Sequence, residues 1–359
     1  MPDTPQQPDT TPPEFGSVDE VADRFAAHGY ITDRRLATTV FLLSRLGKPV
    51  LLEGPAGVGK TELAKTLAAV TGRRLLRLQC YEGQDESRAL YDWDYGKQLL
   101  YTQMLRDKIG DLTADAPDLA TAVGRIEAQD SVFFSERFLA PRPVLEAVRG
   151  ERPAVLLVDE VDRADEALEA MLLECLAEYQ VSVPEIGTFT AKIPPYVVLT
   201  SNNTRDLSAA LKRRCLHLFL DYPDADRELE ILRAKRTGLP EAAERHLVQV
   251  VRGLRALRLR KNPSISETVD WARTLAVLGV EELDPQVLAQ TVNVVLKYER
   301  DLNQALDVLP RLVDPNRALP EPGHGHGHEH SHRHGHSHGH GHSHGHEHGH
   351  SRNRRASRP

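Results

Sequence analysis

The sequence has little of what would indicate a disulfide scaffold, a zinc knuckle or a membrane protein. Its three cysteines (Cys80, Cys175 and Cys215) are scattered without a C-x-x-C pair, as expected of free thiols in a reducing cytosol. No apolar run approaches the roughly 20 residues that a transmembrane helix needs. The N-terminus lacks the basic and apolar segments of a signal peptide. We therefore predict a cytoplasmic protein that does not insert into membranes.

Aromatic residues are also scarce, and acidic residues outnumber basic ones. The formal net charge is −7, and aromatic residues make up only 5% of the chain. Such a chain has no electrostatic reason to bind DNA or an anionic membrane, so we expect no nucleic-acid partner. The length of 359 residues suits two domains plus tails.

The most informative motif lies at residues 54–61, which match the phosphate-loop pattern G-x-x-x-x-G-K-[ST] in full. A short apolar strand pattern precedes it, and a helical pattern follows. The N–H groups of such a turn and the N-terminus of the next helix together cradle polyphosphate. We expect Lys60 to reach the β- and γ-phosphates and Thr61 to ligate Mg²⁺. The predicted nucleotide-binding residues are Gly54, Pro55, Ala56, Gly57, Val58, Gly59, Lys60 and Thr61.

A second buried strand, at 154–158, ends in Asp159 and Glu160. In phosphate-loop enzymes an Asp at this place holds Mg²⁺, and an adjacent Glu can orient and deprotonate the attacking water. The alternative is that the pair only caps the helix beginning near Asp165. Two carboxylates at the end of one buried strand favour the functional interpretation, and hydrolysis over phosphorylation of an acceptor.

The fold class indicated by these patterns is α/β, with a parallel sheet followed by a small all-α lid domain. A long interval between Lys60 and Asp159 predicts an insertion near 104–135. Further strands are predicted at 74–80, 196–200 and 216–220, a hairpin at 181–190, and helices at 18–28, 33–46 and 165–179. The predicted domains are a disordered leader at 1–16, the nucleotide-binding domain at 17–222, the lid at 223–320 and a disordered tail at 321–359.

In chain order, the phosphate loop, the Asp159–Glu160 strand end, the hairpin, the Asn-bearing strand at 196–203 and the basic triplet at 212–214 resemble an AAA+ ATPase of the MoxR family. Residues 81–86 and 91–95 are similar to accessory ATPases of aerobic carbon monoxide dehydrogenase clusters. The resemblance covers about residues 18–315. It implies ATP and Mg²⁺ as cofactors, a hexameric homo-oligomer, and a chaperone role in metalloenzyme maturation beside a protein with a von Willebrand factor A domain.

The resemblance also assigns roles to single residues. Asn202 falls at the family's sensor 1 position, although an Asn there can also simply begin a turn. Arg214 matches the arginine finger that acts on the neighbouring subunit, with Arg213 a close competitor and a solvated basic helix end the alternative for both. The family's sensor 2 arginine has no clear counterpart before Arg273, so that position stays unassigned.

The aromatic segment 91–97 lies where such rings often place a loop in the central pore. Its aromatic side chains could grip a client polypeptide. They could equally pack beneath the predicted insertion.

The C-terminal tail holds fourteen of the seventeen histidines, alternating mainly with Gly and Ser. Such an array cannot form a core, but its imidazoles can bind Ni²⁺, Cu²⁺ or Zn²⁺. The alternative is a passive solubilising tail. The predicted transition-metal ligands are His324, His326, His328, His330, His332, His334, His336, His338, His340, His342, His344, His346, His348 and His350.

Two other functions compete with this interpretation. A nickel-type metallochaperone GTPase would need an Asn-Lys-x-Asp motif to read guanine, and the sequence has none. A DNA-acting AAA+ ATPase is disfavoured by the acidic charge balance and by the lack of any evident DNA-binding module.

Overall fold

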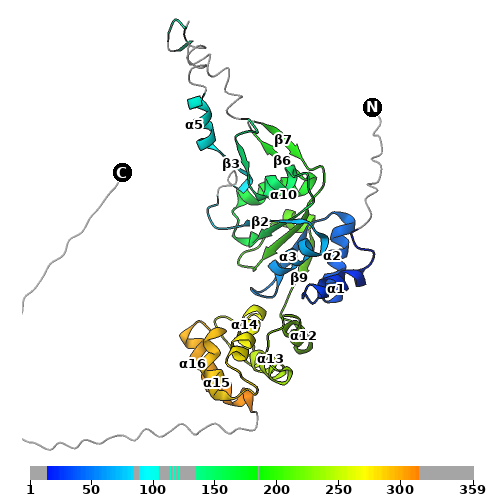
Figure 1. The fold of residues 1–359 in the computed structure, drawn as a ribbon, viewed down its shortest axis with the longest axis vertical. Helices are drawn as coiled ribbons and strands as arrows, with labels where there is room; N and C mark the ends of the chain where they lie inside the picture. The colour runs from blue at the N-terminus through cyan, green and yellow to red at the C-terminus, as the bar shows by residue number, and fades with distance from the viewer. Residues whose placement is uncertain are drawn as a thin grey trace, which may run out of the picture. The chain divides into compact units, whose positions relative to one another are not determined.

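The computed structural model describes residues 14–84, 89–104, 135–184 and 186–314, with a few single positions between 114 and 121. Figure 1 shows the arrangement of the helices and strands. Within the described residues they are α1 (Val18–Ala27), α2 (Arg34–Leu46), β1 (Val50–Glu53), α3 (Lys60–Thr71), β2 (Arg74–Gln79), β3 (Tyr91–Trp93), α5 (Tyr95–Met104), β4 (Leu139–Pro141), α9 (Pro143–Arg149), β5 (Ala154–Asp159), η1 (Val161–Arg163), α10 (Glu166–Glu178), β6 (Gln180–Val183), β7 (Gly187–Thr190), β8 (Tyr196–Ser201), α11 (Ala209–Arg214), β9 (Leu216–Phe219), α12 (Ala225–Ala234), α13 (Glu241–Arg255), α14 (Ile265–Val277), α15 (Pro285–Thr291), η2 (Val292–Val294) and α16 (Glu299–Val313).

A five-stranded sheet in the order β2-β5-β8-β1-β9 forms the centre of the α/β part. All four of its strand pairings are parallel, so the C-terminal ends of the strands meet at one edge. Strands β1, β5 and β8 are buried along their whole length. The parallel sheet confirms the predicted α/β class. The prediction was possible because continuous apolar runs are typical of central parallel strands that are covered on both faces.

Helices cover both faces of the sheet (Figure 1). Alternate residues of β5 point to opposite faces, as the two-residue period of a strand requires. Val155 and Leu157 pack with α1, α2 and α3, whereas Leu156 and Val158 pack with α9, α10 and α11. The sheet is therefore the middle layer of three, and its edge with the C-terminal strand ends lies between the helical layers.

The helices α12 to α16 share a separate apolar core around Trp271, which is fully buried. The Trp271 indole N–H donates to Thr291 Oγ1 at 2.8 Å, which satisfies the ring's polar atom. Arg255 on α13 makes two hydrogen bonds of 2.7 Å to the buried carboxylate of Glu228 on α12. This bidentate pair fixes the two helices against each other.

Residues 91–97 form a strand and the start of a helix rather than a loop. Strand β3 pairs antiparallel with β4, and Tyr91 and Trp93 are half-buried against the core of the α/β part. The next aromatic residue, Tyr95, begins α5 and is 68% exposed. Tyr91 and Trp93 therefore pack against the core, whereas Tyr95 is exposed to solvent. Most of the predicted insertion at 104–135 lies outside the described residues.

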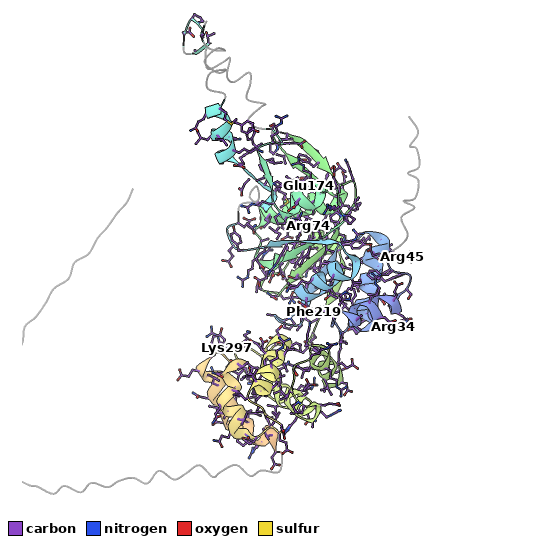
Figure 2. All side chains as sticks on the ribbon, in the orientation of Figure 1. Arg34, Arg45, Arg74, Glu174, Phe219 and Lys297 are labelled. Atoms are coloured by element: carbon purple, nitrogen blue, oxygen red, sulfur yellow. The ribbon has the colours of Figure 1, made fainter. Side chains whose placement is uncertain are left out.

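The first described residues pack against the α/β part, and the charged side chains lie at the surface. Phe15, which sequence patterning placed in the leader, is fully buried, and the Arg24 guanidinium stacks over its ring. Charged side chains such as Arg34 and Arg74 point outward (Figure 2). In the parts of the chain that the structure describes, no helix is both long and apolar enough to cross a membrane.

Candidate nucleotide-binding site

The predicted phosphate loop joins the C-terminal end of β1 to the N-terminus of α3. Gly59 precedes α3 with a φ of 98°, and Lys60 is the first helical residue. Lys60 is 6% exposed, and its ammonium donates to the carbonyl oxygens of Gly54 (2.6 Å) and Pro55 (2.7 Å) and to Asn202 Oδ1 (2.9 Å). Burial lowers the pKa of Lys60 to about 8, although Asp162, Asp159 and Glu160 oppose the shift.

Two glycines of the loop are held in places where no side chain fits. A Cβ on Gly54 would lie 1.9 Å from the carbonyl oxygen of Leu220, and one on Gly57 would lie 2.3 Å from the Cβ of Ser264. Both glycines also have positive φ, 148° and 75°. The motif's glycines therefore allow β9 and the start of α14 to approach the loop closely. In the sequence, Ala56 lies between these two glycines and Val58 follows Gly57.

Asp159 ends β5 and is surrounded by donors from three other elements. Thr61 Oγ1 donates to Asp159 Oδ1 at 3.1 Å, and Thr200 on β8 donates to the same oxygen. Arg77 on β2 donates to the other oxygen at 2.6 Å. Asp159 is 4% exposed, so these bonds compensate for the burial of its charge. Asp159 and Thr61 were predicted from their motifs, whereas Thr200 and Arg77 were not.

The pair formed by Thr61 and Asp159 fits a magnesium ion. Hydroxyl and carboxylate oxygens are the hard ligands that Mg²⁺ prefers, and these two lie 3.1 Å apart at the helix end that faces the phosphate loop. Among the residues that the structure describes, no group of three or more His, Cys, Asp or Glu side chains forms a complete protein-made metal site. Magnesium in proteins commonly takes its remaining ligands from phosphates and water.

Glu160 follows Asp159 in a strained backbone conformation, with a φ of 55°. Its N–H donates to Thr200 Oγ1 at 3.0 Å, and Asn202 Nδ2 lies 3.4 Å from its carboxylate. Arg163 approaches the other carboxylate oxygen at 3.0 Å. The cap of α10 is Asp165, whose side chain accepts from Leu168 N. The capping alternative for the Asp159–Glu160 pair is therefore wrong.

Asn202 connects the two halves of the site. Its side-chain oxygen accepts from Lys60, and its amide nitrogen faces Glu160. Asp162 fixes the backbone here, because it accepts from Asn202 N at 3.2 Å, Thr204 N at 2.9 Å and Thr204 Oγ1 at 2.6 Å. Sequence analysis missed Asp162, although its position three residues after Asp159 in an acidic run was a usable signal.

Arg213 and Arg214 end helix α11 and are both exposed. Arg213 Nε donates to Ala209 O at 3.2 Å, so this side chain folds back on its own helix. The Arg214 guanidinium makes no hydrogen bond or ion pair with the residues that the structure describes. Neither guanidinium contacts Lys60 or Asp159 in this chain.

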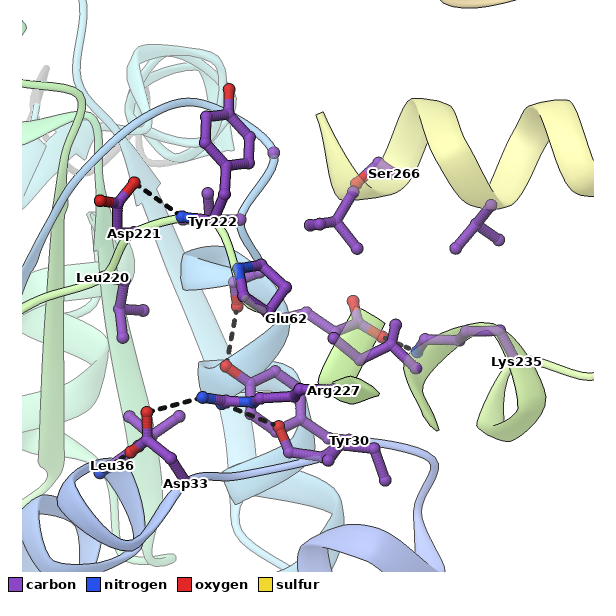
Figure 3. A pocket seen from close by; sticks show the side chains of 18 of the residues that line it. Tyr30, Asp33, Leu36, Glu62, Leu220, Asp221, Tyr222, Arg227, Lys235 and Ser266 are labelled. Carbon is purple, nitrogen blue, oxygen red and sulfur yellow. Dashed lines mark hydrogen bonds and ion pairs between the residues drawn. The ribbon is translucent and has the colours of Figure 1, made fainter. Parts of the chain in front are cut away.

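A cavity of about 730 Å³ adjoins the phosphate loop. It is lined by Tyr30 and Asp33 before and at the start of α2, by the loop glycines 57 and 59, and by residues of α12 and α14 (Figure 3). Tyr30 donates its hydroxyl to Gly59 O at 3.2 Å. Two ion pairs bridge the cavity walls, Arg227–Asp33 at 2.6 Å and Lys235–Glu62 at 3.4 Å. Arg273, the residue left without a role, also lines this cavity.

The predicted metal-binding histidines 324–350 lie outside the described residues, as do residues 85–88 of the segment that carries the family resemblance.

Comparison with known proteins identifies the α/β part. A family model described as the AAA domain of the dynein-related subfamily matches residues 49–215. The chain contains an AAA+ ATPase domain. That domain includes Lys60, Thr61, Asp159, Glu160 and Asn202, together with both arginines of α11. It implies ATP as the nucleotide and ATP hydrolysis as the reaction.

Relatives of the AAA+ domain differ widely in length. Midasin of Dictyostelium discoideum is 26% identical over 222 residues, which cover 60% of this chain but only 3% of midasin. An uncharacterised protein of Staphylococcus haemolyticus is 23% identical over 272 residues, covering 72% of this chain and 88% of that protein. The Holliday junction branch migration motor RuvB of Thermotoga maritima matches with a TM-score of 0.40 and 18% identity, over 78% of this chain and 72% of that one.

Proposed function

We propose that this chain is a Mg²⁺-dependent ATPase of the MoxR type, which assembles into a hexameric ring and remodels a partner protein during metalloenzyme maturation. The observation that carries the ATPase part is the meeting of Lys60, Asp159, Glu160 and Asn202 at one edge of the sheet. In the sequence these residues come from three separate segments. Their convergence supports a hydrolytic site rather than a turn that merely contains glycine.

Each residue takes a role that its chemistry allows. The phosphates of ATP lie over residues 54–61, where Lys60 provides a positive charge. Thr61 and Asp159 hold Mg²⁺, which neutralises negative charge on the phosphates. Glu160 accepts a proton from the attacking water, and Asn202 orients that water through its amide. The cavity of about 730 Å³ beside the loop takes the base and ribose of the nucleotide.

The exposed α11 arginines complete the site of a neighbouring subunit. A guanidinium is always charged and can contact two phosphate oxygens at once. Arg214 suits this role better than Arg213, because Arg213 is hydrogen-bonded to its own helix. Such an arrangement requires at least two subunits, which supports a ring.

The client is a metalloenzyme, and a protein with a von Willebrand factor A domain acts beside the ATPase. This part of the proposal is supported by the resemblance of residues 81–86 and 91–95 to the accessory ATPases of carbon monoxide dehydrogenase clusters. The histidine-rich tail binds Ni²⁺, Cu²⁺ or Zn²⁺ loosely and delivers it. Alternating imidazoles on a Gly/Ser backbone support exchangeable binding.

Hydrolysis is tested by replacing the proposed base. Glu160→Gln keeps the size of the side chain but cannot accept the proton, so it should bind ATP with Mg²⁺ and hydrolyse it at least ~100-fold more slowly. The matched control is Glu166→Gln, an exposed glutamate at the start of α10 that should turn over ATP normally. Turnover by Glu160→Gln close to that of the control would remove Glu160 from the reaction.

A further inference from the structure

Glu53 places a negative charge close to the predicted binding site of the negatively charged phosphates. It is the last residue of β1 and immediately precedes the phosphate loop, and it is 5% exposed. A carboxylate beside a site for polyphosphate repels the ligand, and its burial costs free energy unless it is paired. Packing alone would favour a neutral side chain here.

The side-chain partners of Glu53 both come from one segment, residues 212–220. Lys212 on α11 lies 3.2 Å from one carboxylate oxygen. His217 on β9 donates its Nε2–H to the other oxygen. The backbone of Glu53 is bonded to the same segment, because Leu220 N donates to Glu53 O at 2.7 Å. Three separate bonds therefore tie Glu53 to the segment that contains the exposed arginines.

The next residue of the loop is tied to the same segment by packing. Gly54 lies against the Leu220 carbonyl so closely that a Cβ would be 1.9 Å from its oxygen. The Gly54 carbonyl also accepts from the Lys60 ammonium at 2.6 Å. Phosphate oxygens compete for that ammonium, so nucleotide binding acts on the backbone directly beside Glu53.

The connection from Lys212 to the arginines is short. Lys212, Arg213 and Arg214 are consecutive residues in the last turn of α11. A shift of the Glu53 carboxylate moves or releases the Lys212 ammonium and thereby the end of the helix. A displacement of about 1 Å at a group that stabilises a transition state can cost about 100-fold in rate.

We propose that Glu53 is a positioning residue, which holds the α11 arginines in the orientation that the neighbouring subunit's site requires. It touches neither nucleotide nor Mg²⁺, and it acts through Lys212 on the site of the neighbouring subunit. This inference rests on the proposed role of the α11 arginines in trans.

The test separates the two roles that each subunit has. A donor subunit carries Lys60→Ala, which removes its own site and keeps its arginines. An acceptor subunit carries Arg213→Ala together with Arg214→Ala, which keeps the site and removes the arginines. Mixed in full-length form, the two should recover ATP hydrolysis that neither shows alone. Co-assembly is verified by native mass spectrometry.

Glu53→Gln is then added to one partner at a time. In the donor it should lower the recovered turnover about tenfold or more, because the arginines lose their support. In the acceptor it should change turnover less than about twofold. Lys212→Met in the donor should reproduce the loss without altering the buried residue, which covers the case that Glu53→Gln folds poorly.

The other outcomes overturn the inference in distinguishable ways. A loss confined to the acceptor means that Glu53 supports only its own phosphate loop, and an equal loss in donor and acceptor means that it supports only the fold. No loss in either partner means that Glu53 has no part in hydrolysis. If the unmodified donor and acceptor co-assemble and recover nothing, the arginines do not act in trans, and both the proposed ring mechanism and this inference are rejected.

Discussion

At the scale of single residues, the ammonium of Lys60 is unusual because it is buried. It is buried among the carbonyls of the loop and the side chain of Asn202, and burial lowers its pKa to about 8. A bound polyphosphate favours the charged form. Above pH 8, Lys60 is therefore mostly uncharged in the absence of nucleotide, and nucleotide binding requires it to take up a proton.

We expect ATP affinity to fall above pH 8, by up to about tenfold per pH unit, which is the limit for uptake of one proton. Titration with a fluorescent ATP analogue between pH 7 and pH 9.5 measures it. Lys60→Arg is the control, because a guanidinium stays charged over this range and its affinity should depend less on pH. Parallel profiles for the two proteins would show that Lys60 is not the group that titrates.

At the scale of elements, the turn after β8 is held by one carboxylate from η1. Asp162 accepts three hydrogen bonds from Asn202 and Thr204 and is 3% exposed. Burial raises the pKa of Asp162, but these hydrogen bonds outweigh it, so the pKa lies below its ordinary value. A depressed carboxyl pKa stabilises the fold above the unfolded pKa, and that contribution disappears as pH falls through the folded pKa.

Asp162→Asn should lower the free energy of unfolding at pH 7 by about 1–3 kcal/mol, the usual cost of weakening a buried charged hydrogen-bond group. The difference from the natural protein should shrink as the pH falls below about 4, the ordinary pKa of Asp, because the unfolded chain then takes up a proton that folded Asp162 still resists. Urea unfolding at the two pH values measures it. Asp307→Asn, at an exposed position on α16, should change stability by less than about 0.5 kcal/mol. A loss that is the same at both pH values would contradict the electrostatic explanation.

The elements that sequence patterning predicted are those with local signals. The run that became β5 is apolar throughout, and α10 begins at Asp165 as a side-chain cap predicts. The antiparallel pair of β3 and β4 could not be predicted. Its strands have three residues each, too few to show a period, and they pair Tyr91 with Pro141 across a long stretch of chain.

The residues of the candidate site likewise divide into those with a local sequence signal, which were predicted, and those without one. Lys60, Thr61, Asp159 and Glu160 were found because each lies in a contiguous motif. Arg77 and Thr200 were not, because nothing near them in the sequence marks them. Only the neighbouring positions of β2, β5 and β8 in the sheet bring these side chains to Asp159.

At the scale of the whole molecule, the proposed role of the α11 arginines predicts that a single chain is an incomplete enzyme. Specific ATPase activity should therefore rise with protein concentration as subunits associate, and level off once assembly is complete. Activity measured across a nanomolar to micromolar dilution series, beside sedimentation of the same samples, tests this. Constant specific activity through a concentration range in which the sedimenting species changes would contradict completion in trans.

The tail is predicted to act independently of the AAA+ domain. Deleting residues 323–359 should abolish most binding of Ni²⁺, Cu²⁺ or Zn²⁺ and leave ATP hydrolysis nearly unchanged. In the full chain, metal binding should be strong near pH 7.5 and collapse toward pH 5, because protons compete for imidazoles with a pKa of about 6.5. Isothermal titration at both pH values measures it.

A tail of equal length with every histidine replaced by glutamine is the matched control for that deletion. It should bind no metal and behave like the truncated protein. If the truncated chain loses ATP hydrolysis while the glutamine tail keeps it, the tail serves the ring through its length. If the glutamine tail still binds metal, the imidazoles are not the ligands.

The close packing of Gly54 against Leu220, and of Gly57 against Ser264, has a consequence for mutational tolerance. A saturation scan of the loop should show both positions accepting glycine alone, and the lost variants should be depleted for abundance as well as for ATP binding. Intolerance at these positions reports steric exclusion by neighbouring segments, whereas intolerance at Lys60 reports ligand chemistry. A glycine variant is therefore an unsuitable binding-deficient reference in any assay of this protein, and Lys60→Ala is the appropriate one.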